Sequence, residues 1–327
     1  DTIETRGEGS HGMVASGDSW AYNFNDVTTY GNAAFGMYAL NSSFIYNYGA
    51  ESIETWGDGS HGMVAENGSY AYNDGSVTTH GYDAHGMYAL NGSEADNYGD
   101  ILTTQRRSYG MLAEEGSTVI NRQSGTITTE ENWAHGMVAL SGSLASNRGL
   151  IETSGRNAWG MLAQGGSRVV NRPVGEIITT GRDAYGMVAR GDGSEAVNFG
   201  SVTTSGTDAF GMQALNGGAA FNEEGGIITT SGMGAHGMMA SNDSYVWNGG
   251  TINTSGDNAI GMYALGGSSA DNYGDITTYG VGAHGMMAED ESVAQNWGEI
   301  TTYGNAAFGM YAMNGSFIYN YGADTIE

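Results

Sequence analysis

The chain of 327 residues has no cysteine and no lysine, and its ten arginines stand against 36 carboxylates. Without cysteine there is no disulfide framework, so the fold must be stabilised by its packed core. The formal net charge of −26 argues against nucleic acid and against an anionic membrane surface as partners. The lack of lysine also excludes a phosphate-binding loop that ends in Gly-Lys-Ser or Gly-Lys-Thr.

The sequence also lacks any apolar run long enough for a membrane-spanning helix, and it shows no signal-peptide pattern. We therefore expect no membrane insertion by this segment. No 3.6-residue periodicity runs through the chain, and its 56 glycines would destabilise helices. Both features favour an all-β protein.

What the sequence does have is a repeat. The dipeptide Gly-Met recurs thirteen times in register, at intervals of 24 to 26 residues, and a variable residue and then Ala follow it each time. A five-residue segment that begins with Ser (Gly218 in one repeat) ends with Asn in every repeat. These asparagines are Asn23, Asn47, Asn73, Asn97, Asn121, Asn147, Asn171, Asn198, Asn222, Asn248, Asn272, Asn296 and Asn320. A fixed period that fills the chain is typical of stacked-repeat architectures.

Within each repeat, small or apolar residues alternate with variable, mostly polar ones, as in a β-strand. We expect three short strands per repeat, of which 276–278, 134–139 and 143–147 are examples. The sequence thus predicts a single-chain parallel β-solenoid (β-helix) of about 13 coils, each of 24–26 residues. The known bias of parallel crossovers favours a right-handed coil. Equivalent residues would stack, and the thirteen asparagines would form a structural ladder of hydrogen-bonded amides.

Residues 1–327 are expected to form one continuous repeat domain, since no linker interrupts the pattern. Residues 324–327 repeat residues 1–4, so the chain starts and stops inside the pattern. A solenoid that ends in this way exposes strand edges, which can template further pairing. We expect an excerpt of a longer array, and the alternative is that coils dock end to end into a fibre.

The segment from Asn272 to Thr278, followed by the segment from Ala283 to Ala288, resembles the passenger repeats of bacterial autotransporters. This resemblance covers all thirteen repeats and concerns the style of the repeat, so it transfers no site residues. It implies a β-helix on the bacterial cell surface or outside the cell, in a class that often serves as adhesins.

Aromatic residues give the strongest functional signal. They occupy outward positions of the strand that ends in the ladder Asn, in the first three coils and again later: Trp20, Tyr22, Phe24, Phe44, Tyr46, Tyr48, Tyr70, Tyr72, Tyr245, Trp247, Phe317, Tyr319 and Tyr321. An exposed aromatic column usually marks an interface. Packing against another protein and stacking on sugar rings both fit this pattern.

Arginine forms a second signal, because Arg122, Arg148 and Arg172 follow the ladder Asn in three successive coils. Such a column of like charges needs anions or acidic partner groups opposite it. The alternative is pairing with nearby Glu130, Glu131 and Glu152.

Six histidines directly precede Gly-Met: His11, His61, His85, His135, His236 and His284. Neighbouring rings such as His61 and His85 could share a metal ion. The same position holds Phe, Tyr, Trp or Ile in other repeats, which favours a stack of flat side chains and no metal site.

Two further signals are weaker. Glu289, Asp290 and Glu291 form an acidic turn that could hold Ca²⁺ loosely, and no other cofactor is expected. Thr-Thr pairs resemble ice-binding arrays, but adjacent residues point to opposite faces of a strand and leave only one outward Thr per coil.

The sequence predicts no enzyme, because solenoid lyases and hydrolases use clustered Asp, Arg or Lys that break the repeat. We expect an extracellular structural rod or fibre segment that self-associates, end to end or laterally, through its open ends and aromatic face. The alternative is an autotransporter-type adhesin passenger that binds a host or surface ligand, either a surface protein or a glycan.

Overall fold

The computed structural model describes residues 2–49 and 51–322, so residues 324–327, whose repetition of the first residues was noted above, lie outside the described part. The chain forms two compact units, the N-terminal unit (residues 1–161) and the C-terminal unit (residues 162–327), which are described separately. Every regular element of the described residues is a β-strand, and the 39 strands supply three for each of thirteen coils. No helix long and apolar enough to cross a membrane occurs in this part of the chain.

In the N-terminal unit, every third strand belongs to the same parallel sheet. Sheet A contains β1 (Ile3–Thr5), β4 (Val27–Thr29), β7 (Ser52–Thr55), β10 (Ser76–Thr79), β13 (Asp100–Thr103), β16 (Thr126–Thr129) and β19 (Leu150–Thr153). Sheet B contains β2 (Met13–Ser16), β5 (Met37–Leu40), β8 (Met63–Glu66), β11 (Met87–Leu90), β14 (Met111–Ala113) and β17 (Met137–Leu140). Sheet C contains β3 (Trp20–Asn23), β6 (Phe44–Asn47), β9 (Tyr70–Asn73), β12 (Glu94–Asn97), β15 (Thr118–Asn121) and β18 (Leu144–Asn147).

The C-terminal unit repeats this plan, and β20 (Met161–Gln164) lies at the boundary between the units. Sheet A here contains β22 (Glu176–Thr179), β25 (Ser201–Thr204), β28 (Ile227–Thr230), β31 (Thr251–Thr254), β34 (Asp275–Thr278) and β37 (Ile300–Thr302). Sheet B contains β23 (Met187–Arg190), β26 (Met212–Leu215), β29 (Met238–Ser241), β32 (Met262–Leu265), β35 (Met286–Glu289) and β38 (Met310–Ala312). Sheet C contains β21 (Arg168–Asn171), β24 (Glu195–Asn198), β27 (Ala219–Asn222), β30 (Tyr245–Asn248), β33 (Ser269–Asn272), β36 (Val293–Asn296) and β39 (Phe317–Asn320).

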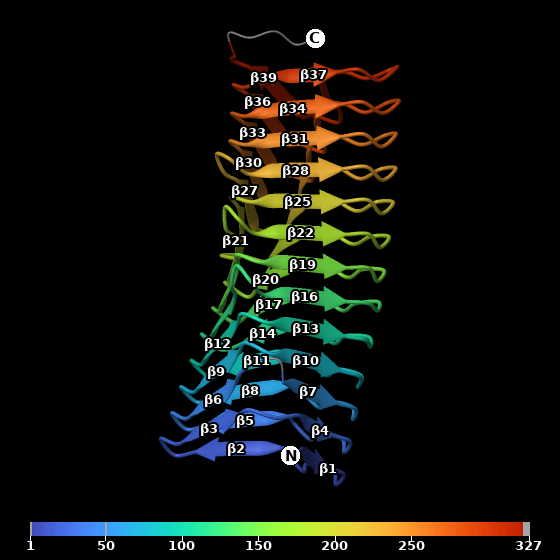
Figure 1. Cartoon of the computed structure of the whole chain (residues 1–327). Helices are drawn as coiled ribbons and strands as arrows, with labels where there is room; N and C mark the ends of the chain where they lie inside the picture. The colour runs from blue at the N-terminus through green and yellow to red at the C-terminus, as the bar shows by residue number, and fades with distance from the viewer. Residues whose placement is uncertain (1, 50, 323–327) are drawn as a thin grey trace. The chain divides into compact units, whose positions relative to one another are not determined.

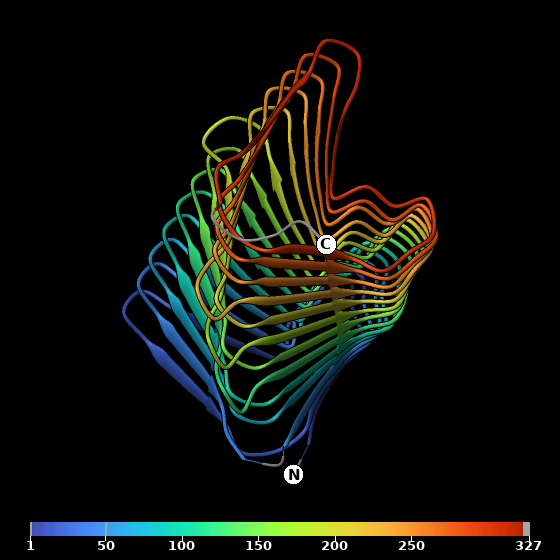
Figure 2. The ribbon, with the colours of Figure 1, turned by 90° about the horizontal axis from the view of Figure 1, so that it is seen from above.

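The register of the sheets follows the sequence repeat. Met37 pairs with Met63 in sheet B, and Asn47 pairs with Asn73 in sheet C. Within each unit the strands of sheet A lie parallel, coil beside coil (Figure 1), and the view along the stack shows the three strands as separate sides of each coil (Figure 2). The predicted parallel β-solenoid, with three strands per coil, is confirmed.

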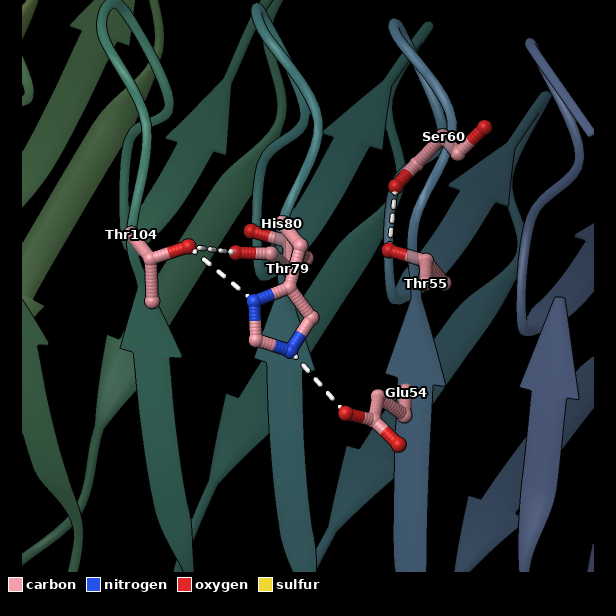
Figure 3. Close-up of polar contacts among 6 residues, drawn as sticks. All are labelled: Glu54, Thr55, Ser60, Thr79, His80 and Thr104. Atoms are coloured by element: carbon pink, nitrogen blue, oxygen red, sulfur yellow. Dashed lines mark hydrogen bonds and ion pairs between the residues drawn. The ribbon is translucent and has the colours of Figure 1, made fainter. Parts of the chain in front are cut away.

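The core of each unit is made by the inward residues of all three sheets. Met from sheet B, Ile or Val from sheet A, and small Ala side chains are fully buried, as Met137 and Ile127 illustrate. The polar ladders lie among them. In most coils the inward threonine at the end of the sheet A strand donates to a carbonyl in the turn that follows, as Thr55 Oγ1 does to Ser60 O at 2.6 Å (Figure 3). Most buried polar groups of these ladders are therefore paired, and Thr254 Oγ1 is an exception among the described residues.

Sheet B begins later than the sequence suggested. The strand predicted over residues 134–139 begins at Met137, because Ala134 closes a turn in which its N–H donates to Glu131 O. Gly136 precedes Met137 at a point of very close packing. A Cβ at Gly136 would lie 2.3 Å from Ile151 Cγ2 and 2.6 Å from Gly160 O, so only glycine fits there. The glycine of the repeated Gly-Met dipeptide is therefore required by close contact between successive coils.

Candidate binding surface

The outer face of sheet C in the N-terminal unit carries a continuous set of aromatic side chains, which we call the N-terminal aromatic surface. Its members are Trp20, Tyr22, Phe24, Phe44, Tyr46, Tyr48, Tyr70, Tyr72 and Tyr98. They come from two outward positions of each strand and from the residue after the ladder Asn. Because parallel strands bring equivalent residues side by side, rings of neighbouring coils lie in contact.

Ring stacking orders this surface. Trp20 and Phe44 stack with centroids 5.5 Å apart, and Tyr22 and Tyr46 stack at 5.2 Å. Tyr46 also stacks on Tyr48 at 5.6 Å, so the columns contact each other as well. Such offset-stacked and tilted pairs are each worth about 0.5–1.5 kcal/mol beyond burial of their area. The surface is thus held in place by its own rings.

The surface remains partly accessible despite this packing. The exposed fractions of Trp20 and Tyr22 are 58% and 47%, and Tyr46 and Tyr72 are half-buried. Burial raises the pKa of Tyr46 and of Tyr72, so both hydroxyls stay protonated at neutral pH and can donate hydrogen bonds. The surface therefore offers large apolar faces together with hydroxyl donors.

An ion pair borders the surface. Arg122 Nη2 lies 2.7 Å from Asp96 Oδ2, and its guanidinium lies 5.7 Å from the centroid of the Tyr98 ring. The Tyr70 hydroxyl donates to the same Asp96 oxygen at 3.0 Å. Asp96 is only 4% exposed. The last aromatic ring is thus covered by an arginine of the chain itself.

The other two arginines of the predicted column have different surroundings. Arg148 follows Asn147 and is exposed, while Arg172 follows Asn171 in the C-terminal unit and is half-buried. The partner of Arg122 is Asp96. It is none of the three glutamates that the sequence suggested, because Asp96 lies on the same outer face one coil earlier.

In the C-terminal unit, the predicted aromatic residues contact further rings that were not predicted from the sequence. Tyr273 lies 6.0 Å from Trp247 and stacks on Trp297 at 4.4 Å, and Trp297 stacks on Tyr321 at 5.0 Å. Phe317, Tyr319 and Tyr321 stack in turn. Tyr98, Tyr273 and Trp297 all directly follow a ladder Asn. Reading that position as a column of its own would have found them.

The asparagine ladder runs inside both units. In the N-terminal unit each amide donates to the next, from Asn23 Nδ2 to Asn47 Oδ1 at 2.8 Å up to Asn121 to Asn147 at 2.9 Å. In the C-terminal unit it runs in the same way from Asn171 to Asn320. These amides lie directly beneath the aromatic positions, so they hold the backbone of sheet C in register.

The six histidines before Gly-Met form stacks with the aromatic residues that share their position. His61 and His85 stack with ring centroids 4.8 Å apart. Every one of the six accepts a backbone N–H of the next coil through Nδ1, at 2.9–3.0 Å: the acceptors are His11, His61, His85, His135, His236 and His284. We call these six residues the histidine clips.

The clips work as neutral imidazoles. An Nδ1 that accepts a hydrogen bond cannot carry a proton, so the proton of the ring sits on Nε2. Burial lowers the pKa of His61 to about 4 and that of His135 to about 3. Parallel stacked rings with occupied Nδ1 atoms do not converge on one point, so the geometry favours the flat stack over a shared metal ion.

The acidic turn predicted to bind Ca²⁺ loosely has two of its three carboxylates engaged. Glu289 accepts the Tyr263 hydroxyl at 2.5 Å, and Asp290 accepts the Asn314 amide at 3.0 Å. Among the described residues, no group of three or more His, Cys, Asp or Glu side chains could hold a metal ion. Weak Ca²⁺ binding at this turn stays a prediction.

Comparison with known proteins agrees with the architecture. Residues 1–160, 153–211 and 209–323 match the family model described as the BigA third pectate lyase-like domain. A solved structure described as the cryo-EM structure of the Vag8–C1 inhibitor complex is similar, with a TM-score of 0.70 and 16% sequence identity. The match covers 98% of this chain and 91% of that chain. None of the curated proteins compared with the chain matches it.

The family match spans nearly the whole chain, and at 16% identity the structural match shows a shared fold. Both agree with the autotransporter resemblance carried by the repeats. The chain belongs to the family of BigA third pectate lyase-like domains and is a β-helical, autotransporter-like protein.

Proposed function

We propose that this chain is an extracellular passenger domain that binds a partner protein through the N-terminal aromatic surface. The observation that carries the proposal is the surface itself, a set of stacked, exposed or half-buried rings on the outer face of sheet C. Tyr and Trp are enriched at protein interfaces, because they bury large areas and still offer polar groups.

The scaffold beneath the surface favours binding. Parallel backbone pairing and the buried asparagine ladder fix the strands that carry the rings. Ring stacking then restricts the side chains before any partner arrives. A preorganised surface loses little conformational entropy on association, so more of the contact energy appears as affinity.

Charge favours a different protein over a second copy of this chain. Two chains that each carry a net charge of −26 repel one another, whereas a neutral or basic partner does not meet this repulsion. The similar solved structure is itself a complex with C1 inhibitor, so a solenoid of this fold can hold a protein partner. Lateral self-association, the first hypothesis from the sequence, is the alternative outcome of the test below.

The proposal assigns no enzymatic activity to the chain. The chain has no lysine, and the arginine beside the aromatic surface, Arg122, is already engaged by Asp96 and Tyr98. A binding role needs no further group.

The test compares the double variant Tyr46→Ser/Tyr48→Ser with the wild-type chain. The matched control is Tyr279→Ser/Tyr303→Ser, which removes another stacked tyrosine pair (centroids 5.1 Å apart) outside sheet C. Biolayer interferometry against a panel of purified extracellular proteins, C1 inhibitor included, measures the affinities. Sedimentation velocity at rising concentration measures self-association.

We expect at least one panel protein to bind the wild type and the control, and to bind the double variant about 100-fold more weakly, as loss of central aromatic contacts commonly does. Binding that both double variants retain equally would overturn the proposal. Concentration-dependent oligomers that only Tyr46→Ser/Tyr48→Ser abolishes would also overturn it, and would establish self-association.

A further inference from the structure

Sheet C of the C-terminal unit contains a shallow hollow that differs from the aromatic columns around it. Its lining residues are Phe221, Glu223, Tyr245 and Trp247, and its volume is about 310 Å³. Phe221 and Tyr245 meet edge to face, with centroids 6.0 Å apart and an interplanar angle of 64°. Three aromatic side chains and one carboxylate thus surround a single space.

Two small residues explain why the space exists. Ala219 pairs with Tyr245 in the register of sheet C, so the position directly beside Tyr245 on that coil carries only a methyl group, and Phe221 approaches the ring from two residues further along the strand. Gly249 follows Asn248, and a Cβ there would lie 2.3 Å from Trp247 Cη2. The indole of Trp247 therefore lies across Gly249, a position that any other residue would deny it.

The charge of the hollow is not compensated from within. Among the described residues, the Glu223 side chain has no hydrogen-bond or ion-pair partner. Residues 191–322 contain thirteen Asp and Glu but no Arg or Lys. The potential around Glu223 is therefore negative, and in a partly desolvated site a cation is the complementary ligand.

We propose that this hollow binds an organic cation, a guanidinium or alkylammonium group, between the aromatic faces of Phe221, Tyr245 and Trp247 and the carboxylate of Glu223. Cations bind over aromatic faces through the ring quadrupole, and tryptophan is the strongest such partner. The carboxylate adds a charge-assisted hydrogen bond. The site is separate from the N-terminal aromatic surface and does not depend on the function proposed for that surface.

The N-terminal unit contains the same chemistry in occupied form. There the Arg122 guanidinium lies over the Tyr98 ring and pairs with the Asp96 carboxylate. At Arg122 the outer face of sheet C thus holds a guanidinium between a ring and a carboxylate. In the C-terminal unit the rings and the carboxylate are present, and the cation has to come from outside.

Isothermal titration calorimetry tests the site with two probes of nearly equal shape. Nα-acetyl-arginine amide carries the guanidinium, and Nα-acetyl-citrulline amide replaces it with a neutral urea. Tetramethylammonium is a third probe, without hydrogen-bond donors. Binding of the arginine probe alone points to the side chain of a protein partner as the source, whereas equal binding of tetramethylammonium points to a small quaternary ammonium ligand. Either result supports the site.

The variants assign the binding to these residues. Glu223→Gln keeps the size of the side chain and removes its charge, and we expect it to weaken binding of the arginine probe about tenfold. Trp247→Leu should abolish binding. The control Glu224→Gln removes the adjacent, exposed carboxylate, which does not line the hollow, and should change affinity less than twofold.

Equal weakening by Glu223→Gln and Glu224→Gln would show attraction to overall charge alone and would overturn the proposal. Equal binding of the citrulline probe would overturn it too, and so would the absence of binding by any cation to the wild-type chain. Because Glu223→Gln alters no packing, the result does not depend on whether Trp247→Leu folds.

Discussion

The two units contain the same tyrosine–aspartate pair on the outer face of sheet C but compensate its charge differently. Tyr70 donates to Asp96 at 3.0 Å, and Tyr245 donates to Asp271 at 2.9 Å, each pair spanning 26 residues. In the N-terminal unit Arg122 adds a full positive charge. In the C-terminal unit Asp271 receives a neutral donor instead, the Gln295 amide at 3.3 Å.

The difference shows that backbone register and outward side chains have separate roles in this fold. Backbone register sets which outward residues meet, and it is the same in both units. The outward residue types then decide whether a site is filled from within or left open to a ligand. Burial raises the pKa of Asp271, which has no arginine to offset it. The asparagine ladders are alike in both units, so the units should differ where outer charges or the number of buried histidine clips differ.

The largest loss of stability should come from changes at the glycine before Met, whose close packing against the next coil is common to both units. Gly136→Ala and Gly237→Ala each place a Cβ 2.3 Å from an isoleucine methyl group and within 2.6 Å of a backbone carbonyl. Since backbone atoms cannot move aside locally, we expect each change to destabilise its own unit by about 4 kcal/mol or more. Hydrogen exchange with mass spectrometry localises the loss. The outward change Thr128→Ala serves as a control, and a large loss in one unit alone would show that the inner packing differs.

The second largest effect should be a difference between the two units in how much stability each loses at low pH. The folded chain keeps its histidine clips neutral, whereas an unfolded histidine binds a proton below about pH 6.5. Stability is therefore fully present above pH 6.5 and falls as the pH drops toward the lowered folded pKa, about 4 for His61 and His236 and about 3 for His135. Burial also places the pKa of His85 well below its usual range.

Three of these four strongly shifted clips lie in the N-terminal unit. At about pH 5.5 each should cost about 1 kcal/mol, so exchange should accelerate more in residues 2–161 than in residues 162–322. His85→Phe is the matched variant, since Phe35 occupies the same position in another coil. It should reduce the acid sensitivity of the N-terminal unit. Equal acceleration in both units would mean that carboxylates, and not the clips, govern acid stability.

A smaller difference should follow from the ion pair. Arg122→Met leaves the nearly buried Asp96 carboxylate without its cation, and we expect a loss of about 2 kcal/mol, since Arg122 is partly solvated. Gln295→Met removes only a neutral donor and should cost less than about 1 kcal/mol. Urea unfolding followed by tyrosine and tryptophan fluorescence measures both.

The double variant Arg122→Met/Asp96→Asn should recover most of the loss, because no charge is then buried. Asp96 Oδ1 and Arg122 Nε are already buried without a hydrogen-bond partner in the described part of the chain, so the native pair is imperfectly satisfied. Failure of the double variant to recover would mean that Arg122 stabilises through packing on Tyr98 and not through its charge.

The sequence predicted whatever the repeat period determines: the strands, their parallel register, the buried ladders and the outward direction of residues such as Tyr46 and Tyr72. It could not show contacts that depend on side-chain conformation or on diagonal neighbours. The pairing of Asp96 with Arg122 crosses coils diagonally, and the histidine clips depend on the ring orientation. The hollow beside Trp247 arises from the small size of Ala219 and Gly249, which carry no chemical signal of their own.

The smallest effect is expected at His80, the one histidine outside the clips. It lies on the outer face of sheet A, where Nε2 contacts Glu54 Oε1 at 3.0 Å and Nδ1 contacts Thr104 Oγ1 at 3.1 Å (Figure 3). Its ring stacks on Trp56 with centroids 4.0 Å apart. Because solvent reaches His80 and Glu54, His80→Gln should cost about 0.5 kcal/mol or less at pH 7.5.

The matched change at a clip, His85→Gln, should cost about 1–2 kcal/mol at the same pH, since it leaves the Tyr109 N–H without its buried acceptor. Urea unfolding of the two variants compares two histidines of the same coil, five residues apart. Equal losses would show that the outer face of sheet A contributes as much as the clips. A larger loss at His85 would show that the neutral imidazole acceptors stabilise the contact between coils. The expected acid sensitivity of the N-terminal unit depends on these acceptors.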